Sequence, residues 1–204
     1  DKFYLDSEYA DDVQFLRGEI RLAQGKLMDA AREFQQVISQ YPGSELYDEV
    51  IAKQYAIGDQ YYERGIARQD KKWRLFKGRP FQRAIDVYSM VIENEPFTDA
   101  AAEAQYKIGL CHFTREEYVE AAFEYRRVIE DYSTSDWVDE AAYGLALCHY
   151  NASLRPEYDQ TPSQLAIDAV DDFRERFPLD DRGEDLNVKR AEMRERIAQQ
   201  RLQT

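Results

Sequence analysis

Apolar residues recur along this chain at intervals of three and four positions, which is the spacing of one face of an α-helix. Glycine and proline, which interrupt helices, number only 9 and 6 among the 204 residues. Two kinds of helical segment follow one another. The first carries an aromatic residue three positions before a small one, as in Tyr55 and Gly58, and the second carries alanine and then an aromatic residue, as in Ala30 and Phe34. The pattern predicts an all-α chain.

The first kind of segment is repeated, most clearly between residues 103–113 and 140–150, which lie 37 residues apart. A small residue occupies the same place in each copy: Gly18, Gly58, Gly109 and Ala146. A second segment follows each copy, and these end at Pro42, Pro96, Ser133 and Pro178. The repetition predicts four helix pairs, followed by one more helix. Their expected ranges are about 11–42, 51–96, 102–133 and 139–178 for the pairs and about 184–203 for the last helix.

A small residue on the first helix, Ala-x-x-x-aromatic on the second and a terminal proline together resemble the tetratricopeptide repeat. The 12 residues from Gly18 to Ala30 recur from Gly109 to Ala121, and small residues at these sites let paired helices approach closely. The resemblance implies a right-handed tetratricopeptide-repeat solenoid with four helix pairs plus a C-terminal single helix, and residues 1–204 as one domain. Stacking is expected because one pair cannot cover its own apolar face.

Two helix starts are predicted from capping residues. Thr114 and Glu117 have the spacing of a capping box and predict the start of the second helix in the third pair. Thr161, Pro162 and Gln164 combine an N-cap, a first-turn proline and a capping partner, which predicts the start of the second helix in the fourth pair.

The second pair departs from the common spacing, because 26 residues separate Gly58 from Ala84. The 14 additional residues are 66–79, and residues 64–83 carry a net charge of +7 against −20 for the rest of the chain. Two interpretations stay open: a solvated extension of both helices, or an arm that docks an acidic partner or lipid head groups. The candidate docking residues are Lys71, Lys72, Trp73, Arg74 and Phe76.

The repeats also predict which side chains line the concave face of such a solenoid. Residues three before and four after each small position lie seven apart, and therefore on one helix face. Seven of these eight positions are aromatic, the exception being Leu22: Phe15, Tyr55, Tyr62, Tyr106, Phe113, Tyr143 and Tyr150. We predict a peptide-binding groove with acidic edges at Asp12, Glu103 and Glu140. The alternative is that the rings fill the space between neighbouring helices.

The chain further resembles the BamD family, the outer-membrane lipoproteins of the β-barrel assembly machinery. The motifs that carry this resemblance are Val37-Ile38-Ser39-Gln40-Tyr41-Pro42, Phe173-Arg174-Glu175-Arg176-Phe177-Pro178, Tyr158-Asp159-Gln160-Thr161 and Ala191-x-x-Arg194-x-x-x-Ala198. It implies five repeats and an N-terminal lipid anchor at the periplasmic face of the outer membrane. It also implies contacts with the barrel-forming subunit and with unfolded outer-membrane proteins. A general tetratricopeptide adaptor with one dedicated partner, periplasmic or cytoplasmic, stays an alternative.

Charge and motif content bear on the remaining function classes. A net charge of −13 argues against nucleic-acid binding, which needs a basic face. Cys111-His112 and Cys148-His149 match a zinc site in number, but adjacent helical residues point about 100° apart, so we expect packing and no metal. No nucleophile–base motif or phosphate-binding loop occurs in the sequence. We therefore predict a protein-binding scaffold without cofactor or enzymatic activity.

Overall fold

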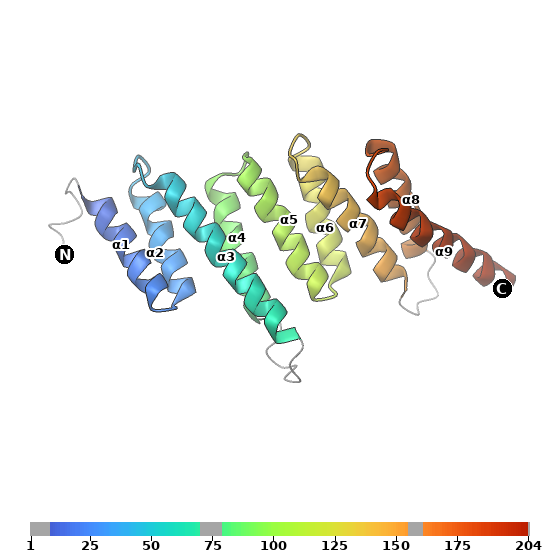
Figure 1. The fold of residues 1–204 in the computed structure, drawn as a ribbon, viewed down its shortest axis with the longest axis horizontal. Helices are drawn as coiled ribbons and strands as arrows, with labels where there is room; N and C mark the ends of the chain where they lie inside the picture. The colour runs from blue at the N-terminus through green and yellow to red at the C-terminus, as the bar shows by residue number, and fades with distance from the viewer. Residues whose placement is uncertain (1–8, 70–78, 155–160, 204) are drawn as a thin grey trace. The chain divides into compact units, whose positions relative to one another are not determined.

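The computed structural model describes residues 9–69, 79–154 and 161–203, and this part of the chain consists of helices joined by short turns (Figure 1). Nine helices occur in these ranges: α1 (Ala10–Ala23), α2 (Leu27–Gln40), α3 (Tyr47–Gln69), α4 (Arg79–Asn94), α5 (Asp99–Thr114), α6 (Tyr118–Asp131), α7 (Val138–Ser153), α8 (Thr161–Arg176) and α9 (Arg182–Gln203). The predicted all-α architecture of four helix pairs and a final single helix is confirmed.

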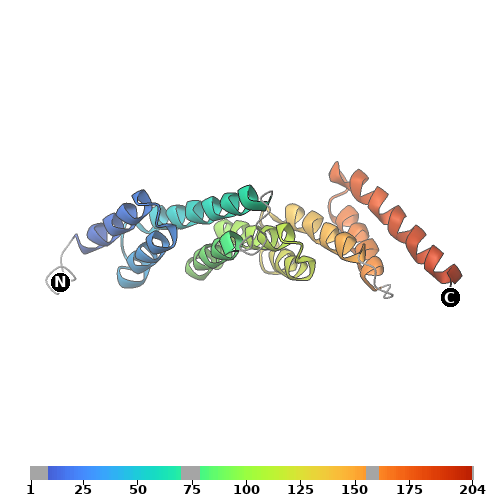
Figure 2. The ribbon, with the colours of Figure 1, turned by 90° about the horizontal axis from the view of Figure 1, so that it is seen from below.

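The chain forms two compact units, residues 1–104 and 105–204. In the first unit α1 packs against α2, α2 against α3, and α3 against α4. In the second unit α6 packs against α7, α7 against α8, and α8 against α9, which also contacts α7 (Figure 2). Contacts between neighbours in the sequence are typical of repeat architectures. One solenoid over residues 1–204 stays a prediction.

The two helices of a pair meet where a glycine on the first faces a buried ring on the second. A β-carbon added to any of these glycines would overlap the ring, so only glycine permits this approach of the helices. The first three pairs follow this rule: an added β-carbon would lie 2.4 Å from the Phe34 ring at Gly18, 2.5 Å from the Tyr88 ring at Gly58 and 2.7 Å from the Tyr125 ring at Gly109.

A glutamine four residues before each of these glycines is buried as well. Its amide donates to a side chain of a second helix, which gives the buried amide nitrogen a partner inside the core. The donors and acceptors are Gln14 to Glu33 at 2.8 Å, Gln54 to Gln35 at 2.8 Å, and Gln105 to Glu124. In the fourth pair the same position is Ala142, which is also buried.

The predicted capping box at Thr114 and Glu117 is wrong. α5 continues through Thr114, whose hydroxyl donates to the Leu110 carbonyl oxygen at 2.7 Å. α6 begins after Glu117, which makes no side-chain cap hydrogen bond. The Glu117 carboxylate instead lies 2.7 Å from Arg115 and 2.8 Å from His112, and a charged donor binds a carboxylate more strongly than a backbone amide does. The predicted start of α8 at Thr161 is confirmed.

The beginning of the predicted insert is part of α3, which continues to Gln69. A β-carbon on Gly65 would lie 2.6 Å from the ring of Phe81, so α3 and α4 pack closely beside the insert. The guanidinium groups of Arg64 and Arg83 lie 5.8 and 5.6 Å from the centre of the Tyr61 ring, as in cation–π contacts. The candidate docking residues Lys71, Lys72, Trp73, Arg74 and Phe76 lie outside the described residues.

Within the part of the chain that the structure describes, no helix combines the length and the apolar character needed to cross a bilayer.

Candidate functional site

The predicted aromatic positions are partly exposed in both units. In the first unit they are Phe15, Tyr55 and Tyr62, and in the second unit they are Tyr106, Phe113, Tyr143 and Tyr150. Each ring therefore has one part in contact with the protein and another part in contact with solvent. The contact with protein contributes to packing, and the part in contact with solvent is available to a ligand.

The rings three positions before the small residues pack against buried rings of the second helices. Tilted and edge-to-face arrangements at these distances are favourable for aromatic pairs. The pairs and their centroid distances are Phe15–Phe34 at 5.3 Å, Tyr55–Tyr88 at 5.6 Å, Tyr106–Tyr125 at 5.5 Å and Tyr143–Phe173 at 6.1 Å.

The same four rings also contact the next first helix in the sequence or the residue that precedes it. The contacts are Lys53 Nζ at 6.0 Å from the Phe15 ring, Glu103 with the Tyr55 hydroxyl, Trp137 stacked at 5.0 Å on Tyr106, and Arg182 at 5.2 Å from the Tyr143 ring. Burial and the hydrogen bond with Glu103 raise the pKa of Tyr55. These rings contribute to packing between successive repeats, and only their exposed parts can face a ligand.

The rings four positions after the small residues also contact neighbouring helices. Tyr62 lies edge-on to Phe81 at 5.6 Å, and Phe113 lies edge-on to Tyr118 at 5.5 Å. The Tyr150 hydroxyl differs, because it donates to Glu192 of α9 at 2.6 Å. Tyr62 and Phe113 are both partly exposed and contact a ring of the second helix of their own pair.

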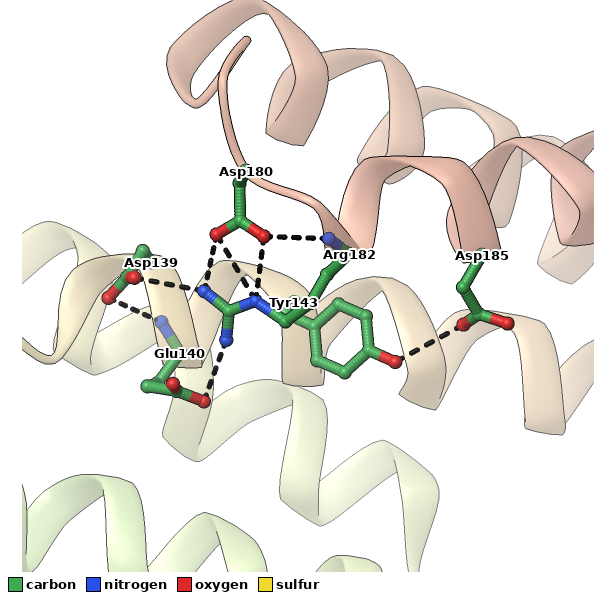
Figure 3. Close-up of polar contacts among 6 residues, drawn as sticks. All are labelled: Asp139, Glu140, Tyr143, Asp180, Arg182 and Asp185. Carbon is green, nitrogen blue, oxygen red and sulfur yellow. Dashed lines mark hydrogen bonds and ion pairs between the residues drawn. The ribbon is translucent and has the colours of Figure 1, made fainter.

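Arg182, the first residue of α9, binds three carboxylates in the second unit (Figure 3). One guanidinium nitrogen, Nη2, lies 2.6 Å from Asp180 and 2.9 Å from Asp139, and the other, Nη1, lies 2.8 Å from Glu140. The hydrogen bonds to Asp180 raise the pKa of Arg182, so that this side chain stays charged. Glu140, predicted as an acidic edge of the groove, therefore forms an ion pair with Arg182 of α9.

α9 also covers the two tyrosines of α7. The Tyr143 hydroxyl donates to Asp185 at 3.2 Å, and burial is the main cause that raises the pKa of Tyr143 (Figure 3). The Lys189 ammonium lies 5.3 Å from the centre of the Tyr150 ring. The repeat pattern predicted a helix here but not these contacts.

The Cys-His pairs are packed in the second unit. Cys111 and Cys148 are buried, and burial raises the pKa of the Cys148 thiol. His112 Nδ1 lies 2.8 Å from Glu117, while burial lowers the pKa of His149. Among the described residues, no group of three His, Cys, Asp or Glu side chains is placed to hold a metal ion.

Two surface hollows of the second unit lie elsewhere. One, of about 560 Å³, is lined by the turn between α6 and α7 together with Arg176 and Phe177. The other, of about 180 Å³, is lined by Arg126, Leu145 and Phe173 among others. None of the seven predicted aromatic residues lines either hollow. The candidate site residues are therefore partly exposed rings in each unit, outside these two hollows.

Comparison with solved structures shows low similarity. A tetratricopeptide repeat protein from Parabacteroides merdae is 17% identical with a TM-score of 0.46, and the match covers 92% of this chain and 59% of that one. MamA is 19% identical with a TM-score of 0.38, and the match covers 89% of this chain and 96% of that one. This chain thus spans 59% of the length of the Parabacteroides protein. None of the curated proteins compared with the chain matches it.

Two family models match the sequence. One, described as a tetratricopeptide repeat, matches residues 12–44, which include α1 and α2. The other, YfiO, described as an outer membrane lipoprotein, matches residues 72–204. The predicted resemblance to the BamD lipoproteins is confirmed by this match. Since it extends over more than half of the sequence, the chain belongs to the YfiO family of outer membrane lipoproteins.

Proposed function

We propose that this protein is a non-enzymatic scaffold and peptide receptor of the outer-membrane β-barrel assembly machinery. It acts at the periplasmic face of the outer membrane, where it binds unfolded β-barrel clients and the barrel-forming subunit. Membership of the outer membrane lipoprotein family supports the location and the scaffold role. The observation that carries the receptor role is the partly exposed ring at seven of eight equivalent first-helix positions.

The rings determine the chemistry of recognition. A client ring that buries ~150 Å² on this surface gains about 4 kcal/mol before the cost of ordering the peptide is subtracted. Ordering a flexible peptide cancels much of this gain, so affinities between about 1 µM and 1 mM are expected. Weak binding through aromatic and apolar side chains suits a receptor that accepts many client sequences.

The test replaces one partly exposed ring in each unit. Tyr62→Ala in the first unit and Phe113→Ala in the second are expected to raise the dissociation constant of labelled β-barrel C-terminal peptides about tenfold, or ~1.4 kcal/mol. Fluorescence anisotropy measures binding, and circular dichroism follows the melting temperature. Phe97→Ala is the matched control, because that ring is 95% exposed and lies in the turn before α5.

The outcomes separate the candidate functions. Unchanged peptide affinity in both ring variants, with native melting, would contradict the receptor role. No affinity of the unaltered protein for several client peptides, together with tight binding to one subunit, would support the general adaptor instead.

We also propose that the basic insert, residues 66–79, is an arm that docks an acidic partner subunit. Lys71→Glu, Lys72→Glu and Arg74→Glu together are expected to weaken capture of that subunit and to leave client-peptide affinity unchanged. Capture that survives this reversal of charge would show that the insert is a solvated extension of the helices.

A further inference from the structure

The outer face of α1 carries an exposed apolar stripe formed by Val13, Leu16 and Ile20. Their exposed fractions are 37%, 56% and 56%. The opposite face of the same helix is buried through Gln14 and Gly18. α1 therefore packs against α2 through one side and leaves three large apolar side chains exposed on another. A contiguous exposed stripe of large apolar residues indicates an interaction surface.

The equivalent face of α7 packs against a neighbouring helix. Ala141 and Cys148 stand five before and two after the small residue Ala146, as Val13 and Ile20 do around Gly18. Both α7 residues are buried in a cluster with Tyr125 of α6. In α7 this face packs onto α6 of the preceding helix pair, whereas in α1 it is exposed.

The α1 stripe has a different shape from the α7 face. Leu16 stands two residues before Gly18, where α7 has Gly144 two residues before Ala146. Gly144 accepts the Tyr125 ring so closely that an added β-carbon would lie 2.7 Å from it. A leucine in that place excludes such a ring. The stripe does not fit the ring-bearing second helix of a repeat like the third.

The spacing of the stripe matches the seam of a coiled coil. In a heptad written abcdefg, Val13 and Ile20 lie seven residues apart and both occupy position 'a'. Leu16 lies between them and occupies position 'd'. β-Branched residues at a with leucine at d favour parallel two-stranded coiled coils. The stripe therefore fits the same stripe on a second copy of the chain.

The charges beside the stripe complement each other in that arrangement. Asp12 occupies a g position and Arg17 the following e position, and both are exposed. In a parallel pair, Asp12 of each copy faces Arg17 of the other, so the contact occurs twice. We propose that α1 pairs with α1 of a second copy of this chain as a short, parallel, two-stranded coiled coil.

The pairing is expected to be weak and reversible. α1 is already held helical by α2, so little conformational entropy is lost on association. The helix has 14 residues, or two heptads, and the contact is at the small end of specific interfaces. A dissociation constant on the order of 10–100 µM is expected from a contact of this size.

Sedimentation equilibrium of the full chain between 1 and 500 µM tests the proposal. The mass is expected to rise from 24.0 kDa toward twice that value. Leu16→Glu with Ile20→Glu is expected to raise the dissociation constant more than tenfold at unchanged helicity. The matched control is Val119→Glu with Phe123→Glu on α6, which changes two residues that are 76% and 58% exposed and leaves α1 intact.

Charge exchange tests the parallel arrangement. Asp12→Arg alone is expected to weaken the dimer several-fold, and Asp12→Arg with Arg17→Asp to restore it. Leu16→Cys is expected to form an intermolecular disulfide, because residue 16 meets its equivalent only in the parallel register. A monomer at every concentration, or a dimer insensitive to the Leu16 and Ile20 replacements, would overturn the proposal. A dimer that the double charge exchange does not restore would overturn its parallel form.

Discussion

Gly109 lies directly against the ring of Tyr125, so that an added β-carbon would stand 2.7 Å from Cε1 of the ring. The other edge of the same ring faces Gly144 of α7, where the corresponding distance to Cε2 is also 2.7 Å. Tyr125 is 2% exposed, so the ring has no free space into which it can move. The close packing of three helices in the second unit depends on the absence of two side chains.

Gly109→Ala is expected to destabilise the protein. Overpacking of a rigid core costs about 1–3 kcal/mol, which exceeds the helix-propensity gain of ~1 kcal/mol from replacing glycine by alanine. Thermal denaturation followed by circular dichroism measures the change. Gly183→Ala is the control, because its β-carbon would meet only the flexible side chain of Arg174 at 3.4 Å. Equal melting temperatures for the two variants would show that Tyr125 can move.

Gln54→Leu is expected to lower the free energy of unfolding by about 1–3 kcal/mol, although it adds an apolar side chain to a buried site. The Gln54 amide donates to Gln35 at 2.8 Å and its carbonyl accepts from Asn94 at 3.1 Å. Leucine leaves both partners with a lost hydrogen bond inside the core. Urea denaturation measures the effect, and Gln82→Leu at an exposed position is the control. A Gln54→Leu protein as stable as the parent would mean that water replaces the amide.

Arg182→Gln is expected to loosen α9, because it leaves Asp139, Glu140 and Asp180 close together without their shared cation. The expected loss of stability is about 1–2 kcal/mol, as for charged hydrogen bonds at a partly exposed site. Hydrogen exchange of the α9 amides should accelerate, and 0.5 M salt should reduce the difference from the parent. Arg194→Gln is the control, since Arg194 is 58% exposed and lies 3.8 Å from Asp171. Unchanged exchange in α9 would show that apolar contacts alone hold this helix.

Stability is expected to fall between pH 7.5 and pH 5.5 partly through His149. Burial and the nearby Arg126 hold the pKa of His149 below its ordinary value of 6.5. The unfolded chain therefore binds more protons than the folded chain as the pH falls below about 6.5, and the free energy of unfolding decreases. His149→Gln should flatten this dependence, as measured by melting temperatures at the two pH values. The depressed pKa values of Asp11, Asp180 and Asp185 act below about pH 4, outside this range. An equal slope in parent and variant would exclude His149 as the cause.

The repeat pattern predicted the helices and the small residues well, and it predicted the site less completely. Gly109 was identified because a small residue recurs at the same place in each copy, which is visible in one dimension. A last helix was predicted from about residue 184, but neither Arg182 nor its three carboxylate partners were identified. A side chain that binds across two helices leaves no periodic signal. The capping prediction at Thr114 failed for a related reason, because the Glu117 carboxylate contacts Arg115 and His112.

The amino-acid sequence by itself determined that this chain is helical, where the helix pairs begin and end, and which small residues admit a ring. Periodicity and side-chain volume are local properties, and they are readable without coordinates. Only the tertiary structure decided how much of each groove ring is exposed and which charges meet. Arg182 and Asp139 are 43 residues apart in the sequence, and their contact exists only because α9 packs on α7. The exposure of Tyr143 and Tyr150 depends on that same packing.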